Sequence, residues 1–170
     1  MKKAIIFDLD GVLVDSSKRF KKLNLKAFDE QNEVEWIKSV KLYNQNCDED
    51  EVIDLGIDLL EMLCSFYKPD TVFFITARGD GGYKPTLRWL KEEGIWREDC
   101  ILIMQPEDFD NYHFYDQKDH ANYKKKVAER ILKNYDIIVA VDDSEDNVQA
   151  YIDLKIPTFK FCVPIGRVLV

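Results

Sequence analysis

The sequence has few of the residues that build disulfide frameworks or zinc sites. Its 170 residues include four cysteines and two histidines, and no two cysteines form a Cys-x-x-Cys pair. Zinc sites of proteins usually need such closely spaced cysteine and histidine ligands. We therefore expect no zinc site, and reduced cysteines that behave mostly as small buried apolar residues.

Long apolar runs and an excess of positive charge are also missing. No run approaches the roughly 20 apolar residues of a membrane helix, and the first residues do not resemble a signal peptide. This predicts a soluble, cytoplasmic protein without membrane contact. The net charge of −8 argues against a broad nucleic-acid groove, but not against binding the end of a strand or one nucleotide. A Gly-x4-Gly-Lys-Ser/Thr loop is absent, which excludes a P-loop kinase.

A short apolar segment near the start of the chain stops at two carboxylates. Residues 4–7 are too short a run for a helix and fit a strand buried on both faces, as in a parallel sheet. Asp8 and Asp10 follow, and Gly11 allows the chain to turn. Ligands of parallel sheets bind at the carboxyl ends of the strands. Two acids at such a place predict a Mg²⁺ site, and two solvated acids in a turn are the alternative.

The same pattern of an apolar run followed by polar residues recurs along the chain. Further strands are predicted over 71–75, 100–104, 137–141 and 158–162. Helical patterns occupy 16–30, 33–43, 48–67, 85–93, 124–132 and 148–152. The alternation predicts an α/β, Rossmann-like fold in which a parallel sheet of about five strands carries helices on both faces. We expect a single domain over residues 1–170, with a small helical insert or minimal cap at about 15–69.

The stretch Asp8-Leu-Asp10-Gly11-Val-Leu resembles the first motif of the haloacid dehalogenase (HAD) superfamily of phosphohydrolases. The resemblance implies the HAD fold, with Asp8 as a nucleophile that forms an aspartyl-phosphate and Asp10 as the general acid and base. A carboxylate nucleophile divides a difficult phosphoryl transfer into two steps. Dehalogenases and ion pumps of the superfamily lack the second Asp, so its presence favours hydrolysis.

Two further family motifs match after later strands. Thr76 stands where the family has a Ser or Thr that binds phosphoryl oxygens. The family's lysine, which neutralises charge between nucleophile and phosphate, corresponds to Lys124 or, as a fallback, to Lys118.

The fourth motif of the family is an acidic pair, and Asp142-Asp143 matches its Asp-Asp form. By resemblance, Mg²⁺ is held by Asp8, by the backbone carbonyl of Asp10, and by Asp142 or Asp143. The sequence leaves open which member of the pair is the direct ligand.

Within the superfamily, Arg19, the stretch Thr76-Ala-Arg78, Lys118-Asp119 ahead of Lys124, and Asp142-Asp143 resemble the 3′-phosphatase domain of phage-type polynucleotide kinase-phosphatases. This likeness adds Arg19, Arg78, Asp119 and Gly11 to the expected substrate-binding and catalytic residues. It implies a Mg²⁺-dependent phosphohydrolase that acts on the 3′-phosphate ends of nucleic acids. The kinase half is missing, and no stable protein partner is implied, although a separate kinase or ligase could work with the protein.

Two other functions remain open. A nucleotidase or another small-molecule phosphomonoesterase would use the same core and would suit the acidic composition. A non-catalytic HAD-like binding module would require one of the four motifs to be broken, and none is.

Two segments have both an ordinary and a functional interpretation. The basic stretch over 18–26 predicts a solvated helix face, or a helix from which Arg19 reaches an anionic substrate. The loop over 105–122 is rich in aromatic residues, which either cover an edge of the domain or stack on a nucleobase. His113 and His120 are interpreted as ordinary polar loop residues.

Overall fold

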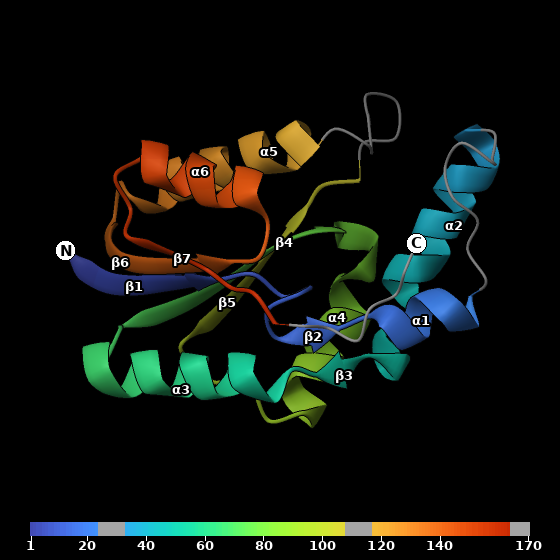
Figure 1. Cartoon of the computed structure of the whole chain (residues 1–170), viewed down its shortest axis with the longest axis horizontal. Helices are drawn as coiled ribbons and strands as arrows, with labels where there is room; N and C mark the ends of the chain where they lie inside the picture. Colours follow the sequence, from blue (N-terminus) through green and yellow to red (C-terminus); the bar gives the residue numbers. More distant parts are fainter. Residues whose placement is uncertain (24–32, 108–116, 164–170) are drawn as a thin grey trace.

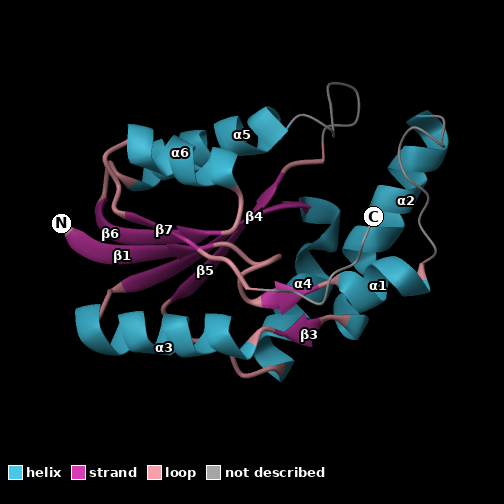
Figure 2. Ribbon diagram, viewed as in Figure 1, coloured by secondary structure: helices cyan, strands magenta, loops and turns pink. Residues whose placement is uncertain are grey.

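The computed structural model describes residues 1–23, 33–107 and 117–163, without the side chains of 33, 34, 36 and 117–119. Its centre is a five-stranded sheet with the order β5-β4-β1-β6-β7, in which every pairing is parallel. Figure 2 shows this sheet in the middle of the molecule. The strands are β1 (Lys2–Phe7), β4 (Thr71–Gly79), β5 (Cys100–Gln105), β6 (Tyr135–Asp142) and β7 (Thr158–Lys160). The predicted parallel sheet is confirmed.

Helices cover both faces of the sheet (Figure 1). On one face lie α3 (Asp54–Tyr67) and α4 (Tyr83–Glu92), and on the other α5 (Gln117–Ile131) and α6 (Glu145–Asp153). Alternate residues of β1 enter the two resulting cores, which explains why this strand reads as a continuous apolar run. Among the described helices, none has both the length and the apolar character needed to cross a bilayer.

The segment between β1 and β4 contains β2 (Val14–Asp15), α1 (Ser17–Lys22), α2 (Glu33–Gln45), the 3₁₀ turn η2 (Cys47–Glu49), β3 (Glu51–Val52) and α3. Figure 1 shows α1 and α2 beyond the carboxyl end of the sheet. The predicted helix over 16–30 is described only as α1, and 24–32 lie outside the described residues. The predicted helix start at Asp48 is wrong. Asp48 belongs to η2, and β3 then pairs with β2, so the helix begins at Asp54.

The segment after β5 also differs from the prediction. Helix α5 begins at Gln117, so Lys124 lies in its middle and His120 belongs to a helix rather than to a loop. The aromatic residues expected in the loop lie outside the described residues: Phe109, Tyr112, His113, Phe114 and Tyr115. A 3₁₀ turn, η3 (Asp80–Gly82), connects β4 to α4.

The loop after β1 is held by the first turn of α3. The Ile53 amide donates to the Leu13 carbonyl oxygen at 2.9 Å. A Cβ atom on Gly56 would lie 1.8 Å from the Val12 carbonyl oxygen, so only glycine permits this approach. The start of α3 therefore fixes the path of the loop that carries Asp10.

Candidate active site

Four of the expected residues converge at the carboxyl end of the sheet. Asp8 directly follows β1, Thr76 lies near the end of β4, Asp142 ends β6, and Lys124 reaches them from α5. The Lys124 Nζ atom lies 2.8 Å from Asp8 Oδ2 and 2.7 Å from Asp142 Oδ2. All four side chains are buried. One ammonium group thus joins the ends of two neighbouring strands.

Three carboxylates gather around this lysine. Asp8, Asp142 and Asp143 each offer one oxygen, and these oxygens all lie within 4.8 Å of one another. We call these three acids, together with Lys124, the acidic cluster. Three negative charges face one positive charge, and hard divalent cations such as Mg²⁺ prefer such oxygen ligands. The residues present therefore fit a Mg²⁺ ion.

The side chain of Asp142 is oriented by its neighbours. The Ser144 amide and the Asn147 Nδ2 group donate to Asp142 Oδ1 at 3.1 and 2.9 Å. Among the described residues, the buried Asn147 Oδ1 atom has no hydrogen-bond partner. An unsatisfied buried acceptor beside three acids is a further feature that suits a hydrated cation.

The crowding of the acids changes their pKa values. Burial and the negative charge of Asp142 raise the pKa of Asp8, against the opposing charge of Lys124. Loss of solvation, with the negative charge of Asp142, also raises the pKa of the Asp143 carboxyl to about 6. Burial works against the charge of Lys124, but its two acidic partners keep its pKa above the usual value. A bound cation would oppose the rise at both acids.

Gly11 allows the chain to turn closely over Asp143. It has φ +78°, and a Cβ atom there would lie 2.2 Å from Asp143 Oδ2. Its amide donates to the Val14 carbonyl oxygen at 2.9 Å and so closes the turn. The Asp10 carboxylate, next to this turn, is held by two arginines.

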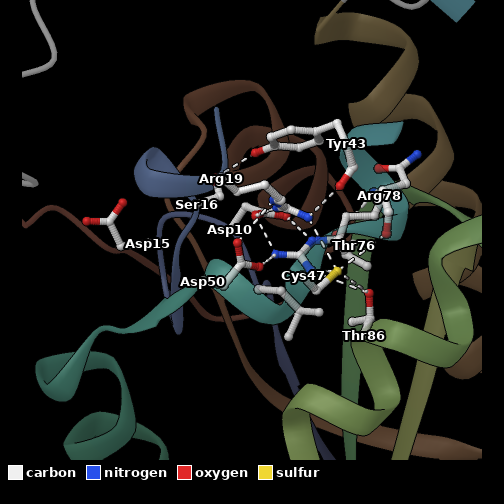
Figure 3. A network of polar contacts seen from close by, with 12 residues as sticks. Asp10, Asp15, Ser16, Arg19, Tyr43, Cys47, Asp50, Thr76, Arg78 and Thr86 are labelled. Carbon is white, nitrogen blue, oxygen red and sulfur yellow. Dashed lines mark hydrogen bonds and ion pairs between the residues drawn. The ribbon is translucent and has the colours of Figure 1, made fainter. Parts of the chain in front are cut away.

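Arg78 binds Asp10 with two parallel hydrogen bonds (Figure 3). The Nε and Nη2 atoms of Arg78 lie 2.6 and 2.7 Å from the two Asp10 oxygens. Nη2 also donates to Asp50 Oδ2 at 3.0 Å. Such fork-to-carboxylate pairs are among the stronger hydrogen bonds of proteins. Arg78 therefore joins Asp10 to a second, buried acid.

Arg19 contacts the same two acids. Its Nε atom lies 3.0 Å from Asp50 Oδ1, and Nη2 lies 3.4 Å from Asp10 Oδ1. The Tyr43 ring covers its guanidinium group at 3.8 Å, as Figure 3 shows. The Arg19 side chain has an exposed fraction of 0%. The structure thus places Arg19 behind Asp10 rather than on the surface. Arg19, Arg78, Asp10 and Asp50 are called the arginine cluster below.

Cys47 completes the surroundings of the two guanidinium groups. Both arginines donate to its sulfur at 3.3 Å through Nη1. The Cys47 thiol in turn donates to the Asn44 carbonyl oxygen at 3.4 Å. The Cys47 side chain is fully buried and Cys100 is buried too, whereas Cys64 is half-buried and Cys162 is exposed, so the expected burial holds for two of the four cysteines.

The two acids of the arginine cluster differ in protonation. Burial alone would raise the pKa of Asp10, but Arg78 and Arg19 outweigh it and hold this pKa below the usual value. For Asp50, burial outweighs both arginines and raises the pKa to about 6. Asp50 is therefore the acid that responds to mild acidification.

A cavity of about 190 Å³ opens between the two clusters. Its lining consists of Asp8, Asp10, Thr76, Ala77, Arg78, His120, Lys124, Ser144 and Asn147. Arg19 and Gly11 are not among these residues. The side chains of Asp119 and of the fallback Lys118 lie outside the described residues.

Several residues of the site were missed by sequence reasoning. Tyr43, Cys47 and Asp50 belong to the insert, where the predicted helix start was wrong, and Asn147 and His120 lie on helices. The remaining basic residues of α1 have an ordinary role, because Lys18 and Lys22 form exposed ion pairs with Glu51 and Glu49.

Comparisons with known proteins agree with this geometry. A family model described as HAD superfamily, subfamily IIIB (acid phosphatase) matches residues 1–164. No curated protein sequence matches the chain significantly.

Three solved structures illustrate the likeness in fold. A chain of the Pnkp1/Rnl/Hen1 RNA repair complex is 21% identical, with a TM-score of 0.63 over 95% of this chain and 42% of that chain. A haloacid dehalogenase-like hydrolase from Streptococcus pneumoniae is 17% identical, with a TM-score of 0.55 over 94% and 84%. A HAD enzyme from Bacteroides thetaiotaomicron, in complex with magnesium and inorganic phosphate, is 17% identical, with a TM-score of 0.50 over 99% and 98%. The chain spans less than half of the RNA repair chain.

Proposed function

Because the chain belongs to subfamily IIIB of the HAD superfamily and is a phosphatase, we propose that it is a Mg²⁺-dependent phosphomonoesterase that removes 3′-phosphates from nucleic-acid ends. The observation that carries the hydrolytic part is the position of Lys124 Nζ between Asp8 and Asp142, at 2.8 and 2.7 Å. This arrangement suits a phosphoryl group placed beside a carboxylate nucleophile.

In this proposal Asp8 is the nucleophile. One Asp8 oxygen attacks phosphorus and the bond to the leaving oxygen breaks. Arg78 holds Asp10 as a carboxylate in this structure, so Asp10 takes up a proton when the ester binds and then gives it to the leaving oxygen. Water then attacks phosphorus, its proton passes to Asp10, and the bond between phosphorus and Asp8 breaks. Inorganic phosphate and the regenerated carboxylate are the products.

The other residues hold the phosphoryl group. Thr76 and Lys124 donate to its oxygens. Arg78 acts from the opposite side of the cavity by holding Asp10, because its N–H groups are engaged by Asp10, Asp50, Cys47 and Thr86. Mg²⁺ would be held by Asp8, the Asp10 backbone carbonyl and the acidic pair at the end of β6. When bound, it supplies charge neutralisation at the phosphoryl oxygens.

The preference for nucleic-acid ends is supported by two features. The motifs of the sequence resemble those of a 3′-phosphatase domain, and the fold is similar to that of a chain in an RNA repair complex. By analogy with that complex, the protein would act beside a separate kinase or ligase, and the cytoplasmic location remains a prediction. Nucleotidase activity is the second candidate, because the net charge of −8 disfavours long polyanions.

A phosphatase assay with Mg²⁺ separates these candidates. It compares oligonucleotides carrying a 3′-phosphate with mononucleotides, sugar phosphates and an aryl phosphate. We expect kcat/KM to be at least about tenfold higher on the oligonucleotides. Higher values on mononucleotides would favour the nucleotidase.

The nucleophile is tested with Asp8→Asn. An amide is not a phosphoryl acceptor, so we expect kcat to fall by about 10³-fold or more on every substrate. Thermal unfolding would check that the variant is folded. Full activity in a folded variant would contradict the assignment of Asp8.

A further inference from the structure

His120 is a cavity residue to which the proposed reaction gives no role. It lines the cavity together with Asp8, Thr76 and Lys124. Its side chain is half-buried, and its Nδ1 atom lies 2.9 Å from Gln105 Oε1. An imidazole in the wall of a small polar cavity is well placed to contact a ligand.

The position of His120 in the fold separates it from the acids. It precedes Lys124 by one turn of α5, so both side chains lie on the same face of the helix. Gln105, which contacts it, ends β5, and β5 lies two strands from β1. At about 4.8 Å per strand, this is roughly 10 Å from the backbone that carries Asp8. His120 therefore forms the wall on the β5 side, opposite the acids that follow β6.

Charge distinguishes these two walls. On the β6 side the cavity is lined by Ser144 and Asn147. Asp142 ends the strand beside them and Asp143 follows it, and Glu145 and Asp146 lie in the first turn of α6. The β4 and β5 side contributes Thr76, Ala77, Arg78 and His120 to the cavity. An anionic chain attached to the phosphoryl group would meet Arg78 and His120 on the β4 and β5 side, and the acidic first turn of α6 on the other.

The His120 ring is held in place by a fixed neighbour. Gln105 pairs with Gly79 at the end of β4, and the Glu107 amide donates to Asp80 Oδ1 at 3.0 Å. An amide oxygen can only accept, so His120 Nδ1 donates to it. A ring oriented in this way is prepared for a specific contact rather than for general solvation.

On the basis of the phosphatase function proposed above, we infer that His120 is a specificity-determining residue, which contacts the sugar of the nucleotide that carries the phosphate. The phosphoryl group lies between Lys124 and Arg78, and the sugar extends along the β5 wall. His120 thereby favours nucleotide esters over esters that lack a sugar.

The test compares two substrates in His120→Ala and His120→Gln. The substrates are an oligonucleotide with a 3′-phosphate and para-nitrophenyl phosphate, which has no sugar. For His120→Ala we expect KM for the oligonucleotide to rise about tenfold, the size expected for one lost hydrogen bond, with kcat almost unchanged. Turnover of para-nitrophenyl phosphate should stay within about twofold. His120→Gln keeps a polar side chain, and it replaces the Ala variant in the comparison if the Ala variant does not fold.

Other outcomes overturn the inference. Equal losses on both substrates would show that the ring only supports the structure, and no change on either would show that it does not contact the sugar. If the wild-type protein hydrolyses mononucleotides but not the oligonucleotide, the nucleic-acid proposal fails. The same comparison is then made with a nucleoside 3′-monophosphate, and the inference survives only if KM rises for that ester alone.

Gln105→Leu gives an independent check. It removes the acceptor that orients the His120 ring but leaves the ring itself in place. We expect a loss of preference for the sugar ester in the same direction, and smaller than that of His120→Ala. An unchanged preference in Gln105→Leu, together with an unchanged one in His120→Gln, would contradict the role of an oriented ring.

Discussion

The two charged clusters at the carboxyl end of the sheet differ in how their charges balance. In the acidic cluster, Asp8, Asp142 and Asp143 face the single ammonium group of Lys124. In the arginine cluster, two guanidinium groups face the carboxylates of Asp10 and Asp50. The first has an excess of negative charge and suits an added cation, whereas the second is neutral without any ligand.

This difference indicates different tasks at one site. An unbalanced cluster gains stability when a cation binds, so it suits the part of the site that is completed by ligands. A balanced and buried cluster needs no added charge, so it suits the part that holds Asp10 in one orientation. Removing a charge from the acidic cluster should therefore abolish catalysis. Removing a charge from the arginine cluster should instead make the orientation of Asp10 less fixed.

The largest effect is expected in the acidic cluster, from Lys124→Met. It removes the charge between Asp8 and Asp142, so we expect kcat to fall by about 10³-fold. Lys125→Met is the matched control, because Lys125 forms an exposed pair with Asp153 and should keep its activity within about twofold. Similar losses in both variants would show that charge at Lys124 has no special role.

A smaller effect on activity is expected in the arginine cluster, from Asp50→Asn. Breaking a buried ion pair from one side costs about 3–5 kcal/mol, which corresponds to a fall of roughly 10 °C in Tm. We expect kcat/KM to fall by about 10- to 100-fold, since Asp10 loses its fixed arginines. In the control Asp48→Asn, only an exposed pair with Arg88 is lost, and both measurements should stay near the wild type. A wild-type Tm in Asp50→Asn would contradict the role of this acid as a bridge.

The boundary between the clusters is tested by Gly11→Ala. Gly11 and Gly94 both have positive φ, at +78° and +71°. A Cβ atom at Gly11 would collide with the Asp143 carboxylate, whereas one at Gly94 would meet nothing within 4 Å. Both variants should lose about 1 kcal/mol through backbone strain. Only Gly11→Ala should also raise the Mg²⁺ concentration needed for half-maximal activity, by about tenfold. If both variants need the same Mg²⁺ concentration for half-maximal activity, the prediction is wrong.

The smallest effect is expected from pH, through Asp50. Its raised pKa of about 6 means that the carboxylate is present above this pH and is lost as the pH falls through it. If the carboxylate aligns the arginines, kcat/KM should fall to about half at pH 6 and to about a tenth at pH 5. The Asp50→Asn variant has no carboxyl group to titrate at this position. Its weaker activity should therefore not fall further between pH 7 and pH 5. If kcat/KM of the variant falls by the same factor over this pH range, the fall is caused by another group.

The sequence was sufficient for one cluster and not for the other. Asp8, Thr76 and Asp142 follow apolar runs, and parallel strands bring their carboxyl ends to the same edge, so their meeting can be predicted from the chain alone. Asp50 reaches its arginines only because η2 and β3 interrupt the expected helix. Such short elements depend on tertiary contacts, among them the pairing of β3 with β2. His120 was misassigned because the start of α5 has little apolar periodicity.

The position of β1 in the sheet links chemistry to assembly of the whole chain. β1 is hydrogen-bonded to β4 on one side and to β6 on the other, so Asp8 meets Asp142 only after segments more than 130 residues apart in the sequence have paired. Contacts of such long range form late in folding and at a high cost in chain entropy. Phosphatase turnover would therefore be a measure of complete folding. A nascent chain whose β6 segment is still inside the ribosome would contain Asp8 but would not be active.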